Sequence, residues 1–349
     1  MDSRQQRPYL GHPGQLAGIR HFEMKSGKAK GVEVFEVTTG GGLQYAVFKD
    51  RCLDLGWASF KGVNFSYMGS PGLVDPAYFD AREDGFLESF FCGLLTTCGL
   101  ASAGAPCVDE GQALGLHGRI GNVPAEESGF ETTDGVDGPG WRIHGRMREA
   151  KFFGVNLALT REITSRFGGN RICIHDRVEN LGFAPQPIQM LYHINFGYPL
   201  LCEDSELVLP ARSVAPRDAR AAEGLGEHLI IEPPQAGYQE QCFYLDLKTD
   251  EEGYAFVAIL NERLGFGVYE RIRKDTLPRF VQWKQMGQGA YVMGLEPGNC
   301  LPDGRKVERE RGNLRYLAGQ EALDMELEIG VLDGTEDLAR FRAKMGGLR

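Results

Sequence analysis

Three short segments of the sequence carry residue types that could exchange protons with a bound molecule. In "PIQMLYHINFGYPLL", His193 stands among apolar residues, where a buried imidazole must find hydrogen-bond partners. In "YVMGLEPGNCLPDG", Glu296 ends an apolar strand and precedes a Pro-Gly turn. In "GLHGRIGNVPAE", His117 lies between glycine-rich turns whose backbone can approach a ligand closely. A carboxylate and an imidazole that faced each other could act as general base and general acid at neutral pH.

Each of these signals alone also fits a structural role. His193 could be a core histidine whose hydrogen bonds are satisfied, and Glu296 could be an ordinary surface carboxylate at the end of a strand. His144, in "WRIHGRMRE", is a second His-Gly pair and competes with His117 for the same role. We favour His117 because its turn is richer in glycine.

The elements that would position these residues are mostly strands. Short runs of β-branched and aromatic residues recur between Gly, Asn, Asp and Pro throughout the chain. The segment "ALDMELEIGVL" (322–332) alternates apolar and acidic residues with a period of two, which is typical of a strand buried on one side. Helical periodicity is weak outside "TEDLARFRAKMGG" (335–347) and a short turn within 75–92. We expect one large, mostly antiparallel all-β domain; the alternative is a second domain that starts near residue 145.

Composition excludes several classes of protein. The 349 residues carry a net charge of −10 and no basic stripe, so a nucleic-acid partner is not expected. The N-terminus lacks the apolar stretch of a secretory signal, and no apolar run is long enough to span a membrane. The eight cysteines form no CxxC pair and are expected to be reduced thiols rather than metal ligands. These features predict a cytoplasmic protein without a membrane partner.

The order of the three motifs resembles the galactose mutarotase (aldose 1-epimerase) superfamily. A His-Gly pair in the first half is followed by an aromatic-His-x-Asn-Phe strand and then by Leu-Glu-Pro with a later Pro-Asp. The likeness is closer to a divergent bacterial aldose 1-epimerase-like group of unassigned substrate. It is carried by "KDRCLDLGWASFKGVNFSYMGSPG" (49–72) and "WKQMGQGAYVMGLEPGN" (283–299). The resemblance runs from about residue 30 to about residue 335, which predicts an N-terminal extension (1–29) and a single sugar-binding domain (30–349).

The resemblance implies a large antiparallel β-supersandwich with few short helices and a sugar site on its concave face. It assigns His193 as general acid, Glu296 as general base and His117 as a residue that binds the sugar near its ring oxygen. The chain departs from the family at Gln239 and Glu240, where many mutarotases carry an Asp-His pair, and at "KDRCLDLG", which replaces the usual "GATVGRYANRI" block. These departures weaken the case for galactose itself. The remaining candidates for contact with the substrate are Arg51, Arg119, Asn195, Glu240, Trp283 and His144.

The residue types suit the interconversion of sugar anomers. That reaction removes a proton from the C1 hydroxyl and donates one to the ring oxygen, so that the ring opens, rotates and closes on the other face. We expect Glu296 to be ionised and His193 protonated, because each charge favours the other. No cofactor, metal or covalent intermediate is required.

The partner is then a monosaccharide or a sugar acid, bound by a monomer or homodimer. Two alternatives remain open. One is a carbohydrate-binding or sensor protein that lost turnover. The other is a different sugar isomerase or lyase that uses the same cleft, with Arg51 or Arg119 as the electrophilic stabiliser.

Overall fold

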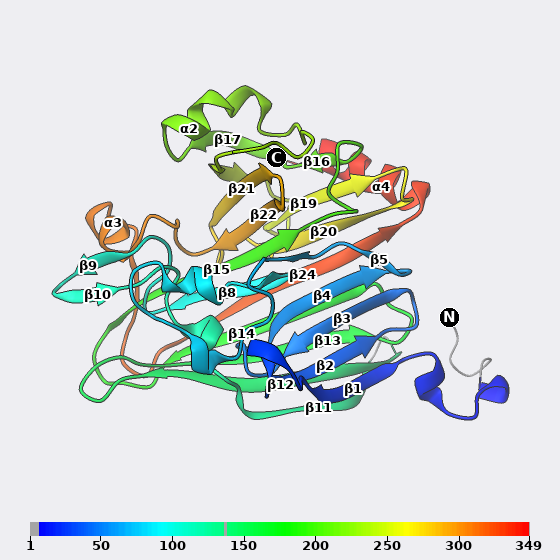
Figure 1. Ribbon diagram of the computed structural model, residues 1–349, viewed down its shortest axis with the longest axis horizontal. Helices are drawn as coiled ribbons and strands as arrows, with labels where there is room; N and C mark the ends of the chain where they lie inside the picture. Colours follow the sequence, from blue (N-terminus) through cyan, green and yellow to red (C-terminus); the bar gives the residue numbers. More distant parts are fainter. Residues whose placement is uncertain (1–6, 136–137, 349) are drawn as a thin grey trace.

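The computed structural model describes residues 7–135 and 138–348, and these residues fold mainly into antiparallel β-sheets (Figure 1). The prediction of an all-β antiparallel fold is therefore confirmed. Of the predicted N-terminal extension, residues 1–6 lie outside the described residues. Gly18–Glu23 forms β1, which pairs with β2 (Glu33–Thr38), and the boundary at residue 30 stays a prediction.

Three large sheets make up the fold. The first has five strands, in spatial order β1, β2, β3 (Leu43–Phe48), β4 (Asp54–Phe60) and β5 (Val63–Asn64). The second has eight, in the order β11 (Glu126–Gly135), β12 (Gly138–Ala150), β13 (Asn156–Arg166), β14 (Arg171–Asn180), β24 (Ala322–Asp333), β20 (Phe266–Arg273), β19 (Tyr254–Asn261) and β16 (Glu206–Val208). The third has seven, with β17 (Ala211–Pro216), β18 (Gln241–Leu247), β21 (Arg279–Gly287), β22 (Ala290–Gly298), β15 (Gln186–Phe196) and β23 (Arg315–Leu317) in order and β8 (Leu95–Leu100) also paired with β15.

Small elements cover the ends of these sheets. Two short two-stranded sheets pair β6 (Tyr67–Met68) with β7 (Cys92–Gly93), and β9 (Cys107–Asp109) with β10 (Gln112–Leu114). The α-helices are α2 (Ala219–Glu223), α3 (Arg305–Glu310) and α4 (Thr335–Gly346), the last of which confirms the predicted C-terminal helix. Single 3-10 turns are η1 (Arg7–Tyr9), η2 (Pro13–Gln15), η3 (Gly27–Ala29), η4 (Pro76–Tyr78), η5 (Gly85–Glu88), η6 (Ile120–Asn122) and η7 (Leu225–Glu227). No helix among the described residues is long and apolar enough to cross a membrane.

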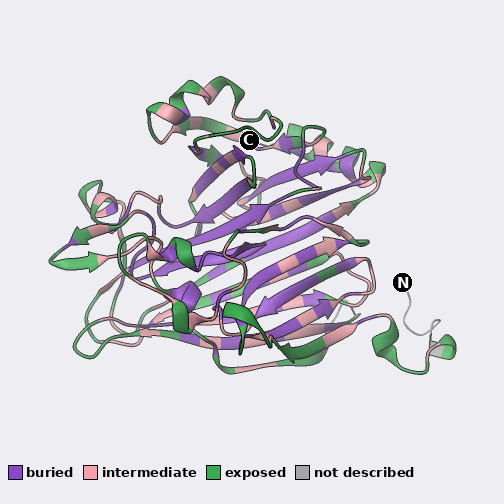
Figure 2. Cartoon of the chain, in the orientation of Figure 1, coloured by how far each residue is buried: buried purple, intermediate pink, exposed green. Residues whose placement is uncertain are grey.

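The main core lies between the eight-stranded sheet and the two other large sheets. Buried residues run along the strands in Figure 2, whereas the connecting loops are largely exposed. In β24, Leu323, Met325 and Leu327 are buried and Asp324 and Glu326 are exposed, as the alternation in the sequence predicted. Glu328 departs from the alternation: it is buried, and its carboxylate accepts from the Tyr269 hydroxyl. Each fully buried side chain of this kind stabilises the fold by about 1.5–3 kcal/mol.

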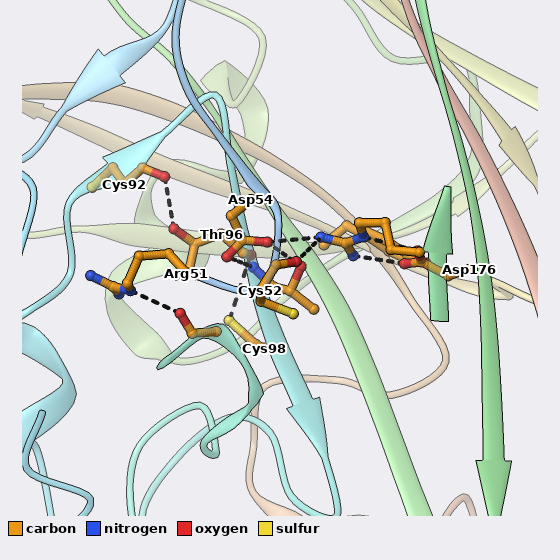
Figure 3. Close-up of polar contacts among 11 residues, drawn as sticks. Arg51, Cys52, Asp54, Cys92, Thr96, Cys98 and Asp176 are labelled. Atoms are coloured by element: carbon orange, nitrogen blue, oxygen red, sulfur yellow. Dashed lines mark hydrogen bonds and ion pairs between the residues drawn. The ribbon is translucent and has the colours of Figure 1, made fainter. Parts of the chain in front are cut away.

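A charged network also crosses this core. Arg161 of β13 is fully buried, and its guanidinium lies 2.9 Å from Asp54 Oδ1 and 2.7 Å from Asp176 Oδ2. The Tyr192 hydroxyl of β15 donates to the same Asp176 oxygen at 2.7 Å. Figure 3 shows Asp54 and Asp176 in this network, which joins all three large sheets.

Strand β15 separates the core from the candidate site. Because side chains alternate along a strand, Tyr192 and Ile194 point into the main core, whereas His193 and Asn195 point to the opposite face of the seven-stranded sheet. A second, smaller apolar cluster covers that opposite face. His193 therefore lies between β15 and this smaller apolar cluster, apart from the main core.

Candidate active site

The pairing of β15 with β22 brings the two predicted proton-transfer residues together. The register pairs Leu191 with Gly298 and Ile194 with Leu295, and it therefore sets His193 directly across from Glu296. Nε2 of His193 lies 3.3 Å from Oε1 of Glu296, and the residues are 4% and 2% exposed. The contact has the length of an ion pair, and Glu296 Oε1 has no hydrogen-bond partner among the described residues.

Asn195 fixes the tautomer of His193. The Asn195 amide nitrogen donates to the carbonyls of His193 (2.8 Å) and Cys92 (3.2 Å), so its oxygen faces the imidazole. Nδ1 of His193 lies 2.7 Å from that oxygen and must donate to it. The other ring nitrogen, Nε2, is then the one that accepts or carries a mobile proton beside Glu296.

Burial disfavours the charged form of each group. It lowers the pKa of His193 to about 3, as does the neighbouring His117 to a smaller extent, while the bond to Asn195 opposes the shift. Burial also raises the pKa of Glu296 well above its usual value, Glu240 adds to this, and Arg217 opposes it. Both shifts act against the charged forms of His193 and Glu296. The expectation from the sequence, an ionised Glu296 beside a protonated His193, stays a prediction, and burial opposes it.

A pocket of about 260 Å³ opens onto this pair. Its lining is mostly apolar and comprises Phe86, Leu87, Phe90, Ala105, Pro106, Leu116, His117, His193, Arg217, Glu240, Cys242, Val281, Trp283, Glu296 and Pro302. The His193 ring centroid lies 5.0 Å from that of Phe90 and 5.1 Å from that of Trp283, both edge-on. Two aromatic rings thus flank the imidazole and cover part of it.

The turn before η6 supplies the second histidine. His117 adopts a left-handed backbone (φ +57°), and its ring lies 5.6 Å from His193 and 5.1 Å from Phe86. Gly118 (φ +74°) cannot be replaced without strain, since a Cβ there would lie 2.0 Å from the Ser102 carbonyl oxygen. The glycine thus permits close approach of the chain's own backbone. Burial lowers the pKa of His117 to about 4, and its Nδ1 has no hydrogen-bond partner among the described residues.

Glu240 and Trp283 form the rim of the pocket with Arg217. The indole Nε1 of Trp283 donates to Glu240 Oε2 at 2.7 Å, and Arg217 Nη2 donates to Oε1 of the same carboxylate at 3.0 Å. Arg217 also donates to Asp218 (2.9 Å) and to the Cys242 sulfur (2.9 Å). The rim is therefore a closed set of charge-assisted hydrogen bonds.

Arg51 does not line this pocket. Its side chain is fully buried; Nε donates to the Gly121 carbonyl (2.9 Å), Nη1 to the Val74 carbonyl (2.8 Å), and both terminal nitrogens reach the Ser89 carbonyl (3.2 Å). In Figure 3 its guanidinium points away from Asp176. Arg51 thus ties together the segment before η4, the residue that follows η5, and η6 itself.

Arg119 and His144 also lie elsewhere. Arg119 is exposed and borders a separate cavity of about 740 Å³ on the other side of the His-Gly turn. His144 is half-buried on β12, in the eight-stranded sheet. Of the two His-Gly pairs, the structure therefore brings His117 to His193.

Some pocket residues escaped the sequence analysis. Phe86, Phe90 and Cys242 read as ordinary core residues, and Arg217 as one of many surface arginines. Gly294 leaves room for the Glu296 carboxylate because it has no side chain: a Cβ there would lie 2.5 Å from Glu296 Oε1. A glycine two residues before a strand-end carboxylate was the one local signal that could have been noticed, because both face the same side of the strand.

Within residues 7–135 and 138–348, no group of three or more histidine, cysteine or carboxylate side chains is placed to hold a metal ion. The chemistry available at the pocket is proton transfer between Glu296, His193 and a bound molecule.

Comparison with known proteins agrees with this fold. A family model described as "Domain of unknown function (DUF4432)" matches residues 29–331. A search of curated proteins gives no match. Among solved structures, a protein from Klebsiella pneumoniae described as a "putative aldose 1-epimerase" is 25% identical, with a TM-score of 0.89 over 94% of this chain and 86% of that one.

Two further structures are more distant. A galactose mutarotase-like protein from Clostridium acetobutylicum is 14% identical, with a TM-score of 0.63 over 91% of this chain and 99% of that one. A galactose 1-epimerase from Lactobacillus acidophilus is 13% identical, with a TM-score of 0.60 over the same shares of the two chains. The predicted galactose mutarotase-like sandwich is confirmed.

Proposed function

This chain belongs to the DUF4432 family, a domain family of unknown function, and we propose that it is a cofactor-independent aldose 1-epimerase-like enzyme. The observation that carries the proposal is the contact of 3.3 Å between His193 Nε2 and Glu296 Oε1 at the wall of a pocket of about 260 Å³. Two adjacent proton-transfer atoms match two oxygens bonded to one carbon, as the ring oxygen and the hydroxyl are at the anomeric carbon. A pocket of this volume suits one sugar ring.

The single proton of the pair balances the reaction. With the proton on His193, Glu296 removes the proton of the C1 hydroxyl while His193 protonates the ring oxygen, and the C1–ring oxygen bond breaks to give an aldehyde. The pair is then neutral, with the proton on Glu296, which is the arrangement that burial favours. After rotation about C1–C2, the reverse transfers close the ring on the other face. Asn195 keeps the imidazole oriented through both half-reactions.

The test is exchange NMR of α and β anomers on a panel of aldoses and uronates, with catalytic amounts of protein. We expect faster exchange for at least one sugar, and a loss of about 100-fold or more in His193→Asn and in Glu296→Gln, because general acid–base groups contribute about 10²–10⁴-fold. His175→Asn and Glu326→Gln, on exposed faces of β14 and β24, are matched controls that keep full activity.

Near-full activity in both site variants would rule out the assignment of the pair. Broadening of sugar signals without faster exchange would identify a binding protein instead. Circular dichroism of each variant separates a loss of chemistry from a loss of fold.

A further inference from the structure

We propose that the substrate is a neutral 6-deoxy sugar whose methyl group packs against an apolar wall formed by Phe86, Phe90 and Leu116. This inference rests on the proposed function and names its substrate class. All three residues line the pocket of the His193–Glu296 pair, and they belong to the apolar cluster on the outer face of the seven-stranded sheet.

The pocket holds few hydrogen-bonding groups that lack a partner. Among the lining residues, polar side chains are His117, His193, Arg217, Glu240, Cys242 and Glu296, and Nδ1 of His117 has no partner among the described residues. The His193–Glu296 pair is needed at the anomeric carbon and ring oxygen. The rim groups of Arg217 and Glu240 already bond to each other, and Trp283 donates to Glu240. A sugar hydroxyl that lost water here without a partner would weaken binding.

The charged side chains of the pocket favour a neutral sugar over a sugar acid. Arg217 is the only lysine or arginine among the lining residues that the structure describes, and it already contacts the carboxylates of Asp218 and Glu240. The carboxylate of a uronate would find no unpaired cation in the pocket and would approach Glu240 and Glu296. Burying a charge without a partner is unfavourable, so the site favours a neutral sugar.

The role of His193 indicates where the substituent on C5 of the sugar lies. If His193 protonates the ring oxygen, the substituent on C5 lies beside His193, since C5 is bonded to that oxygen. The His193 ring is flanked by Phe90, at 5.0 Å, by Trp283, at 5.1 Å, and by His117, which in turn contacts Phe86 at 5.1 Å. A methyl group removes apolar surface from water in these surroundings. The hydroxyl of a hydroxymethyl group would have one unpartnered group to bond to, Nδ1 of His117.

The test compares matched sugars by exchange NMR: 6-deoxygalactose with galactose, 6-deoxymannose with mannose, and 6-deoxyglucose with glucose, in both enantiomeric series, together with galacturonate. We expect kcat/KM for the best 6-deoxy sugar to exceed that of its 6-hydroxy partner by about 10- to 100-fold, the discrimination that an apolar pocket achieves against an added hydroxyl. Galacturonate should exchange at the uncatalysed rate.

Equal kcat/KM values within every pair, or faster exchange of galacturonate, would overturn this inference and leave the proposed function intact. No faster exchange with any sugar would instead overturn the proposed function.

A polar substitution in the wall tests whether the C6 methyl group packs there. Leu116→Asn should shrink the ratio of kcat/KM between the 6-deoxy and 6-hydroxy sugars about tenfold, because the amide offers the hydroxyl a partner. Phe90→Tyr, which adds a hydroxyl at a wall residue beside His193, repeats the test if Leu116→Asn fails to fold. Leu229→Asn, on an exposed leucine outside the pocket, should leave the ratio unchanged. An unchanged ratio in both lining variants would contradict the wall.

Discussion

At the scale of single residues, the site is organised around one shared proton. Asn195 orients the imidazole of His193, so that Nε2 faces Glu296. Apolar cover favours the neutral form of each group, because burial lowers the pKa of His193 and raises that of Glu296. The pair can pass this proton through a sugar in either direction without a net change of charge in the pocket.

This arrangement predicts an unusual pH profile. An ordinary histidine near pKa 6.5 would gain a proton as the pH falls through that value. Because the pKa of His193 is lowered to about 3, the pair gains no second proton until far lower pH. We expect kcat/KM for anomer exchange, corrected for the uncatalysed rate, to show no loss as the pH falls from about 8 to about 5. Loss of activity with a midpoint near the ordinary histidine pKa would show that His193 is solvated.

At the scale of elements, two strands set the geometry of the pair. The β15–β22 register puts His193 and Glu296 opposite each other, and period-two alternation turns both away from the main core. Within β22, Gly294 leaves room for the Glu296 carboxylate beside Trp283. A slip of one residue in this pairing would turn the carboxylate into the core.

Filling the space at Gly294 should therefore displace the base. In Gly294→Ala the new Cβ would lie 2.5 Å from Glu296 Oε1 and 2.9 Å from Trp283 Cβ, so that one of them must move. We expect kcat to fall by about 100-fold, since a misplacement of about 1 Å can have that effect. Gly226→Ala is the control, as no atom lies within 4 Å of its added Cβ. A folded Gly294→Ala protein with unchanged kcat would show that this space does not position Glu296.

At the scale of the whole molecule, the sheets are held together by apolar packing and by the buried Arg161 network. Arg161 bonds to Asp54 on the five-stranded sheet and to Asp176 on its own sheet, and Tyr192 connects Asp176 to the strand that carries His193. Breaking a buried ion pair leaves a charge without compensation in a dry core. The network therefore links the position of β15 to the packing of the sandwich.

Removal of Arg161 should destabilise the protein strongly. We expect Arg161→Met to lower the free energy of unfolding by about 3–5 kcal/mol, because two buried carboxylates lose their partner. In Arg177→Met, which removes an exposed ion pair with Asp324 (2.9 Å), the change should stay within about 1 kcal/mol. Urea unfolding followed by circular dichroism measures both. Similar values for the two variants would mean that the buried network adds little to stability.

Some of the candidate residues chosen from the sequence line the pocket, and others do not. The residue types of His193 and Glu296 and their strand context were visible in the sequence, and the structure brings both to one pocket with His117, Glu240 and Trp283. Arg51, Arg119 and His144 were chosen on the same kind of local pattern and do not line that pocket. A local pattern does not separate residues that line the pocket from residues that lie elsewhere, because it does not specify on which face of which sheet a side chain lies.

By itself, the sequence determined the strand character of the chain, because alternation with a period of two depends only on near neighbours and on one buried face. The tertiary structure alone decided the β15–β22 register, the rim made by Arg217 and the aromatic cover from Phe86 and Phe90. These features depend on contacts between segments far apart in the chain, whose energies add up only when the sheets pack. The pKa shifts of His193 and Glu296 are likewise decided by the tertiary structure, because they follow from the burial that the assembled fold imposes.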